Sequence, residues 1–406
     1  MADIPEHFPP TRAAALTRLE AFAPKTAGQY AKGRNVDFGA GRHEAVSTLS
    51  PYIRARLLTE PEVARAALDH HRAADADKFL SEVFWRTYWK GWMELRPAVW
   101  QMYRADLNRL ADEVQTQSGL RQRWEDACLG RTGIAPFDGW AKELTQTGYL
   151  HNHARMWFAS IWIFTLKLPW QLGADFFLRH LLDGDAAVNT LSWRWVAGIQ
   201  TVGKTYLATE SNIAKFTDGR FTSVPGLASD APAIAYPPNP AAGLLPPAAP
   251  LPLVARHGVL LHGDDCDPAP LRINDMPPLT FGYLDATQGH SPWQMAPHVA
   301  AFRRAAARDR APDLSVMDSA EGIALWAQKH QLDQIVTPYA PVGPVQDVLQ
   351  AYRARPDALP LNQRRRDFEE AAWPLATKGF FPFRKHIPDL VNRFVRGQGT
   401  FSLAAG

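Results

Sequence analysis

The fold of this chain is decided by residues 148–195, which read GYLHNHARMWFASIWIFTLKLPWQLGADFFLRHLLDGDAAVNTLSWRW. Arg155 and Met156 follow Asn152 by three and four residues. On a helix this spacing places the three side chains on one face. An apolar, aromatic run follows, so the stretch predicts a buried helix with one polar face.

An acidic turn comes next in the same stretch. Asp183 and Asp185 flank a glycine, which suits a tight turn that presents two carboxylates. A buried arginine needs a paired carboxylate, so Arg155 and Asp183 are predicted to form an ion pair. The turn is followed by an amide and two indoles, Asn189, Trp193 and Trp195.

This succession resembles the helical FAD-binding domain of the photolyase and cryptochrome family. The family pattern is G-W-x-H-N-x-x-R-M, then D-G-D, then N-x-x-x-W-x-W. Tyr149 departs from it, because photolyases usually carry Trp there. The resemblance implies non-covalently bound FAD, with Asn189 facing flavin N5. Within this stretch it assigns cofactor contacts to Asn152, Arg155, Asp183, Gly184, Asp185 and Asn189.

A second segment, residues 46–52, reads VSTLSPY and resembles the family's T-S-x-L-S-P-Y, which wraps the flavin pyrophosphate. Ser50 can cap a helix whose first residue is Pro51, and helix N-termini attract anions. Taken alone, the segment is also an ordinary helix start, and Val46 lacks the hydroxyl of the family's threonine. The further cofactor contacts that the resemblance implies are Tyr30, Ser47, Thr48, Leu49, Ser50 and Arg86.

The helix predicted over residues 79–92 carries a polar and aromatic face and resembles the family's F-L-x-E-L-x-W-R-E-F-Y helix. An aromatic wall beside a carboxylate suits a nucleobase pocket. The alternative is a core helix in which Arg86 neutralises Glu82. The resemblance implies that UV-damaged DNA is the partner, with lesion contacts from Glu82, Trp85, Trp89, Met156 and Trp195.

The chain holds 14 tryptophans, and the resemblance implies that some of them carry electrons to the flavin. It places Trp193 nearest the cofactor and Trp170 next. The position of the usual third member holds Ala127. Candidates for that third member are Trp124, Trp157 and Trp162, and core packing is the alternative role for each.

The activity that the resemblance implies is light-dependent repair of cyclobutane pyrimidine dimers, by electron transfer from reduced FAD. Asn189 favours this repair branch over plant-type photoreceptors. Enzymes for (6-4) photoproducts carry two histidines where this chain holds Asn152 and Met156, so that substrate fits less well. A cryptochrome-type photoreceptor and a flavoprotein without photochemistry stay as alternatives. The implied catalytic residues are Glu82, Asn152, Met156, Trp193 and Trp170.

The composition is typical of a large globular chain, with 406 residues of which 46% are hydrophobic and 21% charged. A net charge of +3 neither requires nor excludes a nucleic-acid partner. Two cysteines, Cys128 and Cys266, indicate a reducing compartment rather than a disulfide or zinc framework. The N-terminus lacks the apolar segment of a signal peptide. We expect a cytoplasmic monomer without a metal site or membrane association.

The predicted fold class is α plus α/β, in three parts. Residues 1–223 form the helical FAD-binding domain, and residues 224–256 form a Pro- and Ala-rich linker. Residues 257–406 alternate strands with helices, which predicts a small, parallel, Rossmann-like α/β domain. This part resembles the antenna domain that photolyases carry at their N-terminus. It lacks a phosphate-binding glycine motif, so a second, antenna chromophore stays unknown. The sequence also does not indicate whether single- or double-stranded DNA is preferred.

Overall fold

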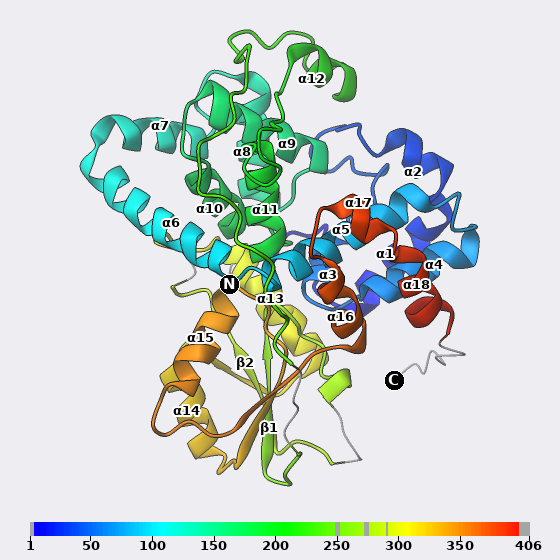
Figure 1. The fold of residues 1–406 in the computed structure, drawn as a ribbon, viewed down its shortest axis with the longest axis vertical. Coiled ribbons are helices and arrows are strands. Elements are labelled where there is room, and N and C mark those ends of the chain that lie inside the picture. Colours follow the sequence, from blue (N-terminus) through cyan, green and yellow to red (C-terminus); the bar gives the residue numbers. More distant parts are fainter. Residues whose placement is uncertain (1–3, 248–251, 272–275, 290, 398–406) are drawn as a thin grey trace.

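The computed structural model describes residues 4–247, 252–271, 276–289 and 291–397. Helices fill the upper part of Figure 1, and a parallel sheet with its own helices fills the lower part. The predicted fold class, a helical region followed by a parallel α/β region, is confirmed. None of the described helices is both long and apolar enough to cross a bilayer.

The helical region owes its core to large aromatic side chains. Trp100, Trp140, Trp157, Trp162 and Trp193 are fully buried, and each indole removes roughly 150–250 Å² of surface from water. The helices of this region, with two short η segments, are α1 (Arg12–Phe22), η1 (Ala23–Lys25), α2 (Gly28–Gly33), α3 (Ser50–Arg54), α4 (Glu60–His70), α5 (Asp77–Glu94), α6 (Ala98–Thr116), α7 (Ser118–Cys128), α8 (Ala135–Thr147), α9 (Asn152–Ser160), η2 (Ile161–Thr165), α10 (Trp170–His180), α11 (Ala186–Val196) and α12 (Glu210–Phe216).

The apolar run after Met156 is broken in the structure rather than forming one core helix. The helix α9 ends at Ser160 and continues as one π-helical turn, η2. Lys167 then adopts a left-handed backbone with φ of 54°, and Pro169 precedes the first residue of α10. Proline lacks an N–H and cannot continue a helix from the preceding turn, so α10 starts anew at Trp170.

The α/β region contains one five-stranded sheet in which every pairing is parallel, in the order β3-β2-β1-β4-β5. The final strand, β5, was missed from the sequence, because LNQR shows no apolar alternation. It pairs with β4 at the edge of the sheet. The elements are β1 (His257–His262), η3 (Ala269–Leu271), β2 (Thr280–Leu284), α13 (Pro297–Arg310), β3 (Leu314–Met317), α14 (Ala320–Lys329), β4 (Gln334–Pro338), α15 (Pro344–Arg353) and β5 (Leu361–Arg364).

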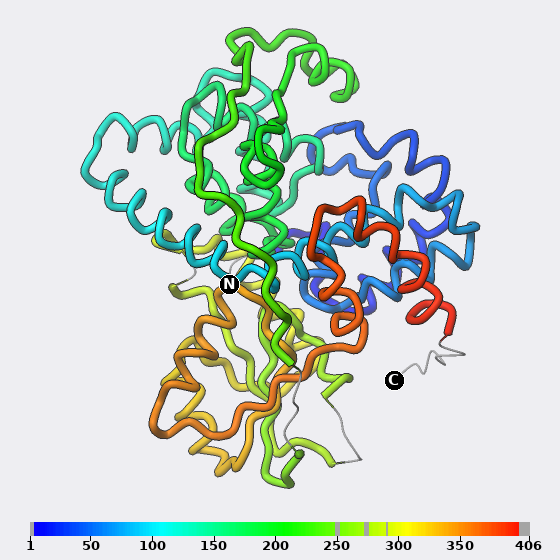
Figure 2. The backbone as a smooth tube through the Cα atoms, viewed as in Figure 1, coloured from blue at the N-terminus to red at the C-terminus, as the bar shows by residue number. Residues whose placement is uncertain are grey.

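Residues 217–247, which we call the strap, connect α12 to the α/β region in extended form and cross the helical region (Figure 2). The strap is bonded to the helices along its length. Ile234 N–H donates to the Ala197 carbonyl at 3.0 Å, and Gly243 N–H donates to the Leu95 carbonyl at 2.7 Å. The Pro- and Ala-rich segment is therefore not a free spacer between the two regions.

After β5 the chain returns to the helical region, where its last elements pack on α4 and α5 (Figure 1). The sequence assigned these residues to the α/β domain, so the boundary at 257–406 is corrected here. Their local sequence pattern does not indicate which surface they pack against. We call them the return helices: α16 (Asp367–Ala372), η4 (Trp373–Leu375), α17 (Phe380–Arg384), α18 (Ile387–Val391) and η5 (Asn392–Arg396).

Candidate functional site

The acidic turn lies at the end of α10 and forms the predicted ion pair. Arg155 Nη1 and Nη2 donate to the two Asp183 carboxylate oxygens at 3.1 and 3.0 Å. Burial alone would raise the pKa of Asp183. The charge of Arg155, and hydrogen bonds from Arg155 and Ser50, outweigh burial and lower the pKa below its usual value. Asp183 is therefore a buried, ionised carboxylate with a fixed orientation.

Asp185 joins the turn to α11 and to a group of buried cations. One carboxylate oxygen caps α11, accepting from the N–H groups of Ala187 and Val188 at 3.0 Å each. The other accepts from Arg86 Nη2 at 3.0 Å and lies 3.8 Å from Lys90 Nζ. Burial would raise the pKa of Asp185, but Arg86 and Lys90 hold it well below its usual value. Lys90 was missed from the sequence, although it lies one helical turn after Arg86 on α5.

The segment over residues 46–52 folds differently from its prediction. Ser50 is the first residue of α3 and Leu49 is the cap, with no side-chain hydrogen bond at the cap. Ser50 is not a helix cap because its hydroxyl turns toward Asp183, whose pKa it helps to lower. The helix has only 5 residues, so its N-terminus offers little dipole for an anion. Thr48 takes a left-handed backbone, with φ of 49°, and its hydroxyl accepts from Arg18 at 2.5 Å. Leu49 is buried and Ser47 is half-buried.

The N-terminal end of α5 carries the predicted lesion carboxylate. Glu82 is 37% exposed and forms an ion pair with Arg34, a residue that the sequence analysis did not single out. Arg34 is also hydrogen-bonded to Tyr30, which is buried. Glu82 therefore has a cation other than Arg86 as its partner, because Arg86 is turned toward Asp185. A basic residue 48 positions earlier in the chain leaves no local signal of this pairing.

The predicted lesion tryptophan is half-buried and has one face covered by an aromatic ring. Trp85 stacks on Phe380 of α17, with ring centroids 3.6 Å apart and planes 12° apart. Trp89, itself buried, lies 5.3 Å away. Trp195 is half-buried and stacks on Tyr206 at 5.9 Å.

The polar face of α9 is only partly turned into the core. Asn152, the first residue of the helix, is exposed, whereas Arg155 and Met156 are half-buried. Asn189 is buried on α11, and its amide donates to the Ala174 carbonyl at 2.7 Å. This hydrogen bond fixes the orientation of the Asn189 side-chain NH2 group. That Asn189 faces flavin N5 stays a prediction.

Trp193, the first tryptophan of the predicted electron path, contacts Gly173 and Trp162. Trp193 packs over Gly173, where an added Cβ would lie only 2.2 Å from the indole. Gly173 follows Trp170 by three residues on α10, so roughly one helical turn separates Trp170 from the point that Trp193 touches. Trp162 meets Trp193 edge-on at 6.1 Å.

The other candidates for the third position lie elsewhere. Trp124 packs on Trp293 at 4.7 Å, and Trp157 stacks on His153 at 4.0 Å. Trp170 instead contacts two tyrosines, Tyr103 at 5.8 Å and Tyr236 of the strap at 5.9 Å. The identity of a third member stays open.

The donor set around the acidic turn fits FAD. A flavin offers lactam oxygens and nitrogens, ribityl hydroxyls and a pyrophosphate, which require donors, acceptors and cations together. Arg86 Nε is buried without a hydrogen bond and lies 3.8 Å from Glu60, so the Arg86 guanidinium supplies positive charge at this point. The hydroxyl of Ser50 is hydrogen-bonded to Asp183 of the turn. The residues that would hold the cofactor are Arg86, Arg155, Asp183, Asp185 and Asn189.

Comparisons with known proteins match the part of the chain that contains this site. Residues 79–219 match the model of the FAD binding domain of DNA photolyase. A deoxyribodipyrimidine photo-lyase of Thermus thermophilus is 34% identical over 196 residues, which are 47% of this chain and 43% of that protein. The enzyme of the same name from Escherichia coli is 30% identical over 206 residues, 49% of this chain and 42% of that protein. The chain thus spans less than half the length of these curated relatives.

Two solved structures are similar at lower identity. A Synechocystis cryptochrome aligns with a TM-score of 0.42 and 20% identity, over 51% of this chain and 43% of that one. A class III photolyase of Agrobacterium tumefaciens aligns with a TM-score of 0.36 and 24% identity, over 51% and 42%. The matched helices and the acidic turn define a photolyase-type FAD-binding region. Through this region the chain is similar to proteins of the photolyase and cryptochrome family.

Proposed function

We propose that this protein binds FAD at the acidic turn and uses light to split cyclobutane pyrimidine dimers in damaged DNA. The observation that carries the proposal is the paired arrangement of Arg155 with Asp183 and Arg86 with Asp185, inside the residues that match the photolyase FAD-binding domain. Bound FAD would supply light absorption and one-electron transfer. The chain itself supplies binding, orientation and charge.

Several residues are assigned roles on this proposal. Glu82 is accessible on α5 and would hydrogen-bond a flipped base. Asn152 and Met156 lie on one face of α9 beside Arg155 and would contact the lesion or the flavin. Trp193 and Trp170 would carry electrons toward the flavin, because both indoles are buried and Trp193 touches Gly173, about one turn of α10 after Trp170.

A groove beside α5, the helix that carries Glu82 and Trp85, suits DNA. It has a volume of about 600 Å³ and lies between the start of α5 and the return helices. Ser81 and the exposed Phe381 line it, together with Arg384, Lys385 and Arg396. Arg384 is paired with Asp77, which also lines the groove, so Lys385 and Arg396 are the cations left to attract the phosphate backbone. Damaged DNA, bound by a monomer, is accordingly the proposed partner.

One observation favours a cryptochrome-type photoreceptor as the second candidate. Phe380 covers one face of Trp85, the predicted lesion tryptophan. A base can stack on that face only after Phe380 moves away. A photoreceptor has no lesion to hold and would tolerate this arrangement.

The two functions are separated by one assay. Purified protein is loaded with FAD, reduced, and illuminated with blue light in the presence of an oligonucleotide that carries one cyclobutane dimer. Dimer splitting that requires light supports the photolyase. Flavin photochemistry without any loss of dimer supports the photoreceptor, and a protein that binds no FAD contradicts both. A parallel reaction with a (6-4) photoproduct tests the substrate that Asn152 and Met156 argue against.

A further inference from the structure

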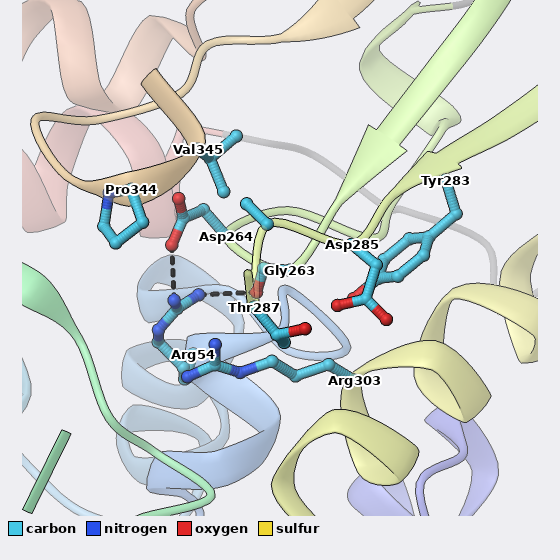
Figure 3. Close-up of a pocket in the computed structure, with 10 residues that line it drawn as sticks. Arg54, Gly263, Asp264, Tyr283, Asp285, Thr287, Arg303, Pro344 and Val345 are labelled. Atoms are coloured by element: carbon cyan, nitrogen blue, oxygen red, sulfur yellow. Dashed lines mark hydrogen bonds and ion pairs between the residues drawn. The ribbon is translucent and has the colours of Figure 1, made fainter. Parts of the chain in front are cut away.

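The residues that follow β1, β2 and β4 line a cavity together with Arg54 of α3 (Figure 3). In an open parallel sheet, ligands bind at the carboxyl ends of the strands where the strand order reverses. Here that reversal falls between β1 and β4. Arg54 and Arg303 occupy this crevice and leave a cavity of about 10 Å³, which is room for about one water molecule. An aromatic ligand does not fit there beside the two arginines.

Arg54 connects the crevice to the acidic turn. Its Nε donates to the Gly184 carbonyl at 2.8 Å, and its Nη1 donates to the Gly263 carbonyl at 2.5 Å. Its Nη2 forms an ion pair with Asp264. One guanidinium therefore bonds the centre of the turn and the loop after β1 at the same time.

Arg303 reaches the same point from the α/β region. It lies on α13, and its Nη2 donates to the Gly184 carbonyl at 3.0 Å. Figure 3 shows its guanidinium beside that of Arg54. A carbonyl oxygen has two lone pairs, so these two donors saturate it.

The turn is also closely packed at this point. A Cβ on Gly184 would lie 3.0 Å from the carbonyl oxygens of Leu178 and Leu181, so only glycine fits without a shift. Arg54 and Arg303 are 5% and 6% exposed. Two buried cations side by side are unfavourable unless hydrogen bonds and counter-charges compensate them. Asp264 and the carbonyl oxygens provide that compensation.

We propose that the α/β region serves as a positioning element for the flavin. Arg54 and Arg303 use the crevice of the sheet to hold the Gly184 carbonyl, and thereby fix Asp183 and Asp185 at the cofactor. The inference rests on the proposed binding of FAD at this turn. Both arginines act through the turn, so they are positioning residues.

The test compares four full-length proteins with the wild type. Arg303→Ala and Arg303→Met remove the donors, and Arg303→Met keeps most of the side-chain volume. Arg303→Lys restores one donor. Arg304→Ala is the matched control, because Arg304 is the next residue of α13 and donates to Asp285 at 2.6 Å instead. The measurements are the rate of FAD release and, in FAD-free protein, hydrogen exchange of the amides of residues 182–189.

We expect Arg303→Ala and Arg303→Met to release FAD about tenfold faster, the effect of losing one charge-assisted hydrogen bond. Amide exchange in the turn should also rise, Arg303→Lys should recover part of both effects, and Arg304→Ala should match the wild type. Wild-type release and exchange in Arg303→Met, which is the variant least disturbed in packing, would overturn the proposal. If the wild type binds no FAD, the flavin proposal fails, while the exchange data still decide whether Arg303 holds the turn.

Discussion

Phe380 lies flat on Trp85, with their ring centroids 3.6 Å apart. The two residues are far apart in the chain, and they meet because the return helices pack on α5. The contact places a C-terminal side chain on the residue that the family resemblance assigns to the lesion. Its removal gives the most direct distinction between the two candidate functions.

Phe380→Ala should expose one face of Trp85. For a photolyase we expect tighter binding to a dimer-containing oligonucleotide, by up to roughly 1–3 kcal/mol, the value of stacking one base on an aromatic ring. Binding is measured by fluorescence anisotropy. Leu325→Ala is the control, because its side chain is 57% exposed on α14 and does not line the proposed DNA groove. Equal affinity for damaged and undamaged DNA in Phe380→Ala would favour the photoreceptor.

Asp183→Ala should strip the protein of flavin. It leaves the Arg155 guanidinium, 23% exposed, without its bidentate carboxylate, and breaking such a pair costs roughly 3–5 kcal/mol when buried. The partial exposure of Arg155 places the expected loss at the lower end of that range. FAD content is read from the absorption spectrum after purification. Asp357→Ala removes a carboxylate from a surface pair and should retain all of its flavin.

Glu94 predicts a pH dependence of stability. Burial raises the pKa of this carboxyl to about 7, although Tyr339 and the Val342 N–H donate to it at 2.7 and 2.6 Å. Because the folded state binds the proton more tightly, the free energy of unfolding should fall as the pH rises from about 4.5 to about 7, by a few kcal/mol at most. Above that range the contribution of Glu94 is constant.

The contribution of Glu94 is isolated by comparison with Glu94→Gln, which keeps an acceptor oxygen but does not ionise. Urea unfolding at several pH values gives the free energy of each protein. The difference between the two proteins should change with pH between about 4.5 and 7 in favour of Glu94→Gln. A constant difference would show that Glu94 is ionised at the same pH in the folded and unfolded states.

Trp193→Phe should slow the light-driven loss of oxidised flavin absorption when an external reductant is present. Phenylalanine keeps much of the packing over Gly173 but is far harder to oxidise than an indole. Trp170→Phe should have a smaller effect in the same assay. Trp326→Phe is the control, because it changes a buried tryptophan of the α/β region. If Trp193→Phe bleaches at the wild-type rate, another residue donates the electron.

The central ion pair of the site could be predicted from the sequence. Arg155 and Asp183 were paired because a buried arginine requires a carboxylate, and the structure shows that pair. Arg34 and Phe380 were not found, because each meets α5 only through long-range packing. Ser50 was assigned as a cap from its local pattern, but tertiary contact with Asp183 determines its role.

The same limit applies to the fold. The strands with continuous apolar patterns, such as β1 and β4, could be predicted, whereas β5 is polar and is defined only by its pairing to β4. The linker was predicted from its composition. Composition indicates an extended chain but not the helices on which that chain packs. Its bonds to Leu95 and Ala197 depend on surfaces assembled from distant parts of the sequence.

The return helices also constrain the order in which the chain can be completed during synthesis. Residues 367–396 pack on α4 and α5, yet they leave the ribosome only after the whole α/β region. Domains usually fold as units from the N-terminus while translation continues. Here α5 must wait for nearly the entire polypeptide before its aromatic surface is covered. We therefore expect the nascent chain to expose that surface through most of its elongation.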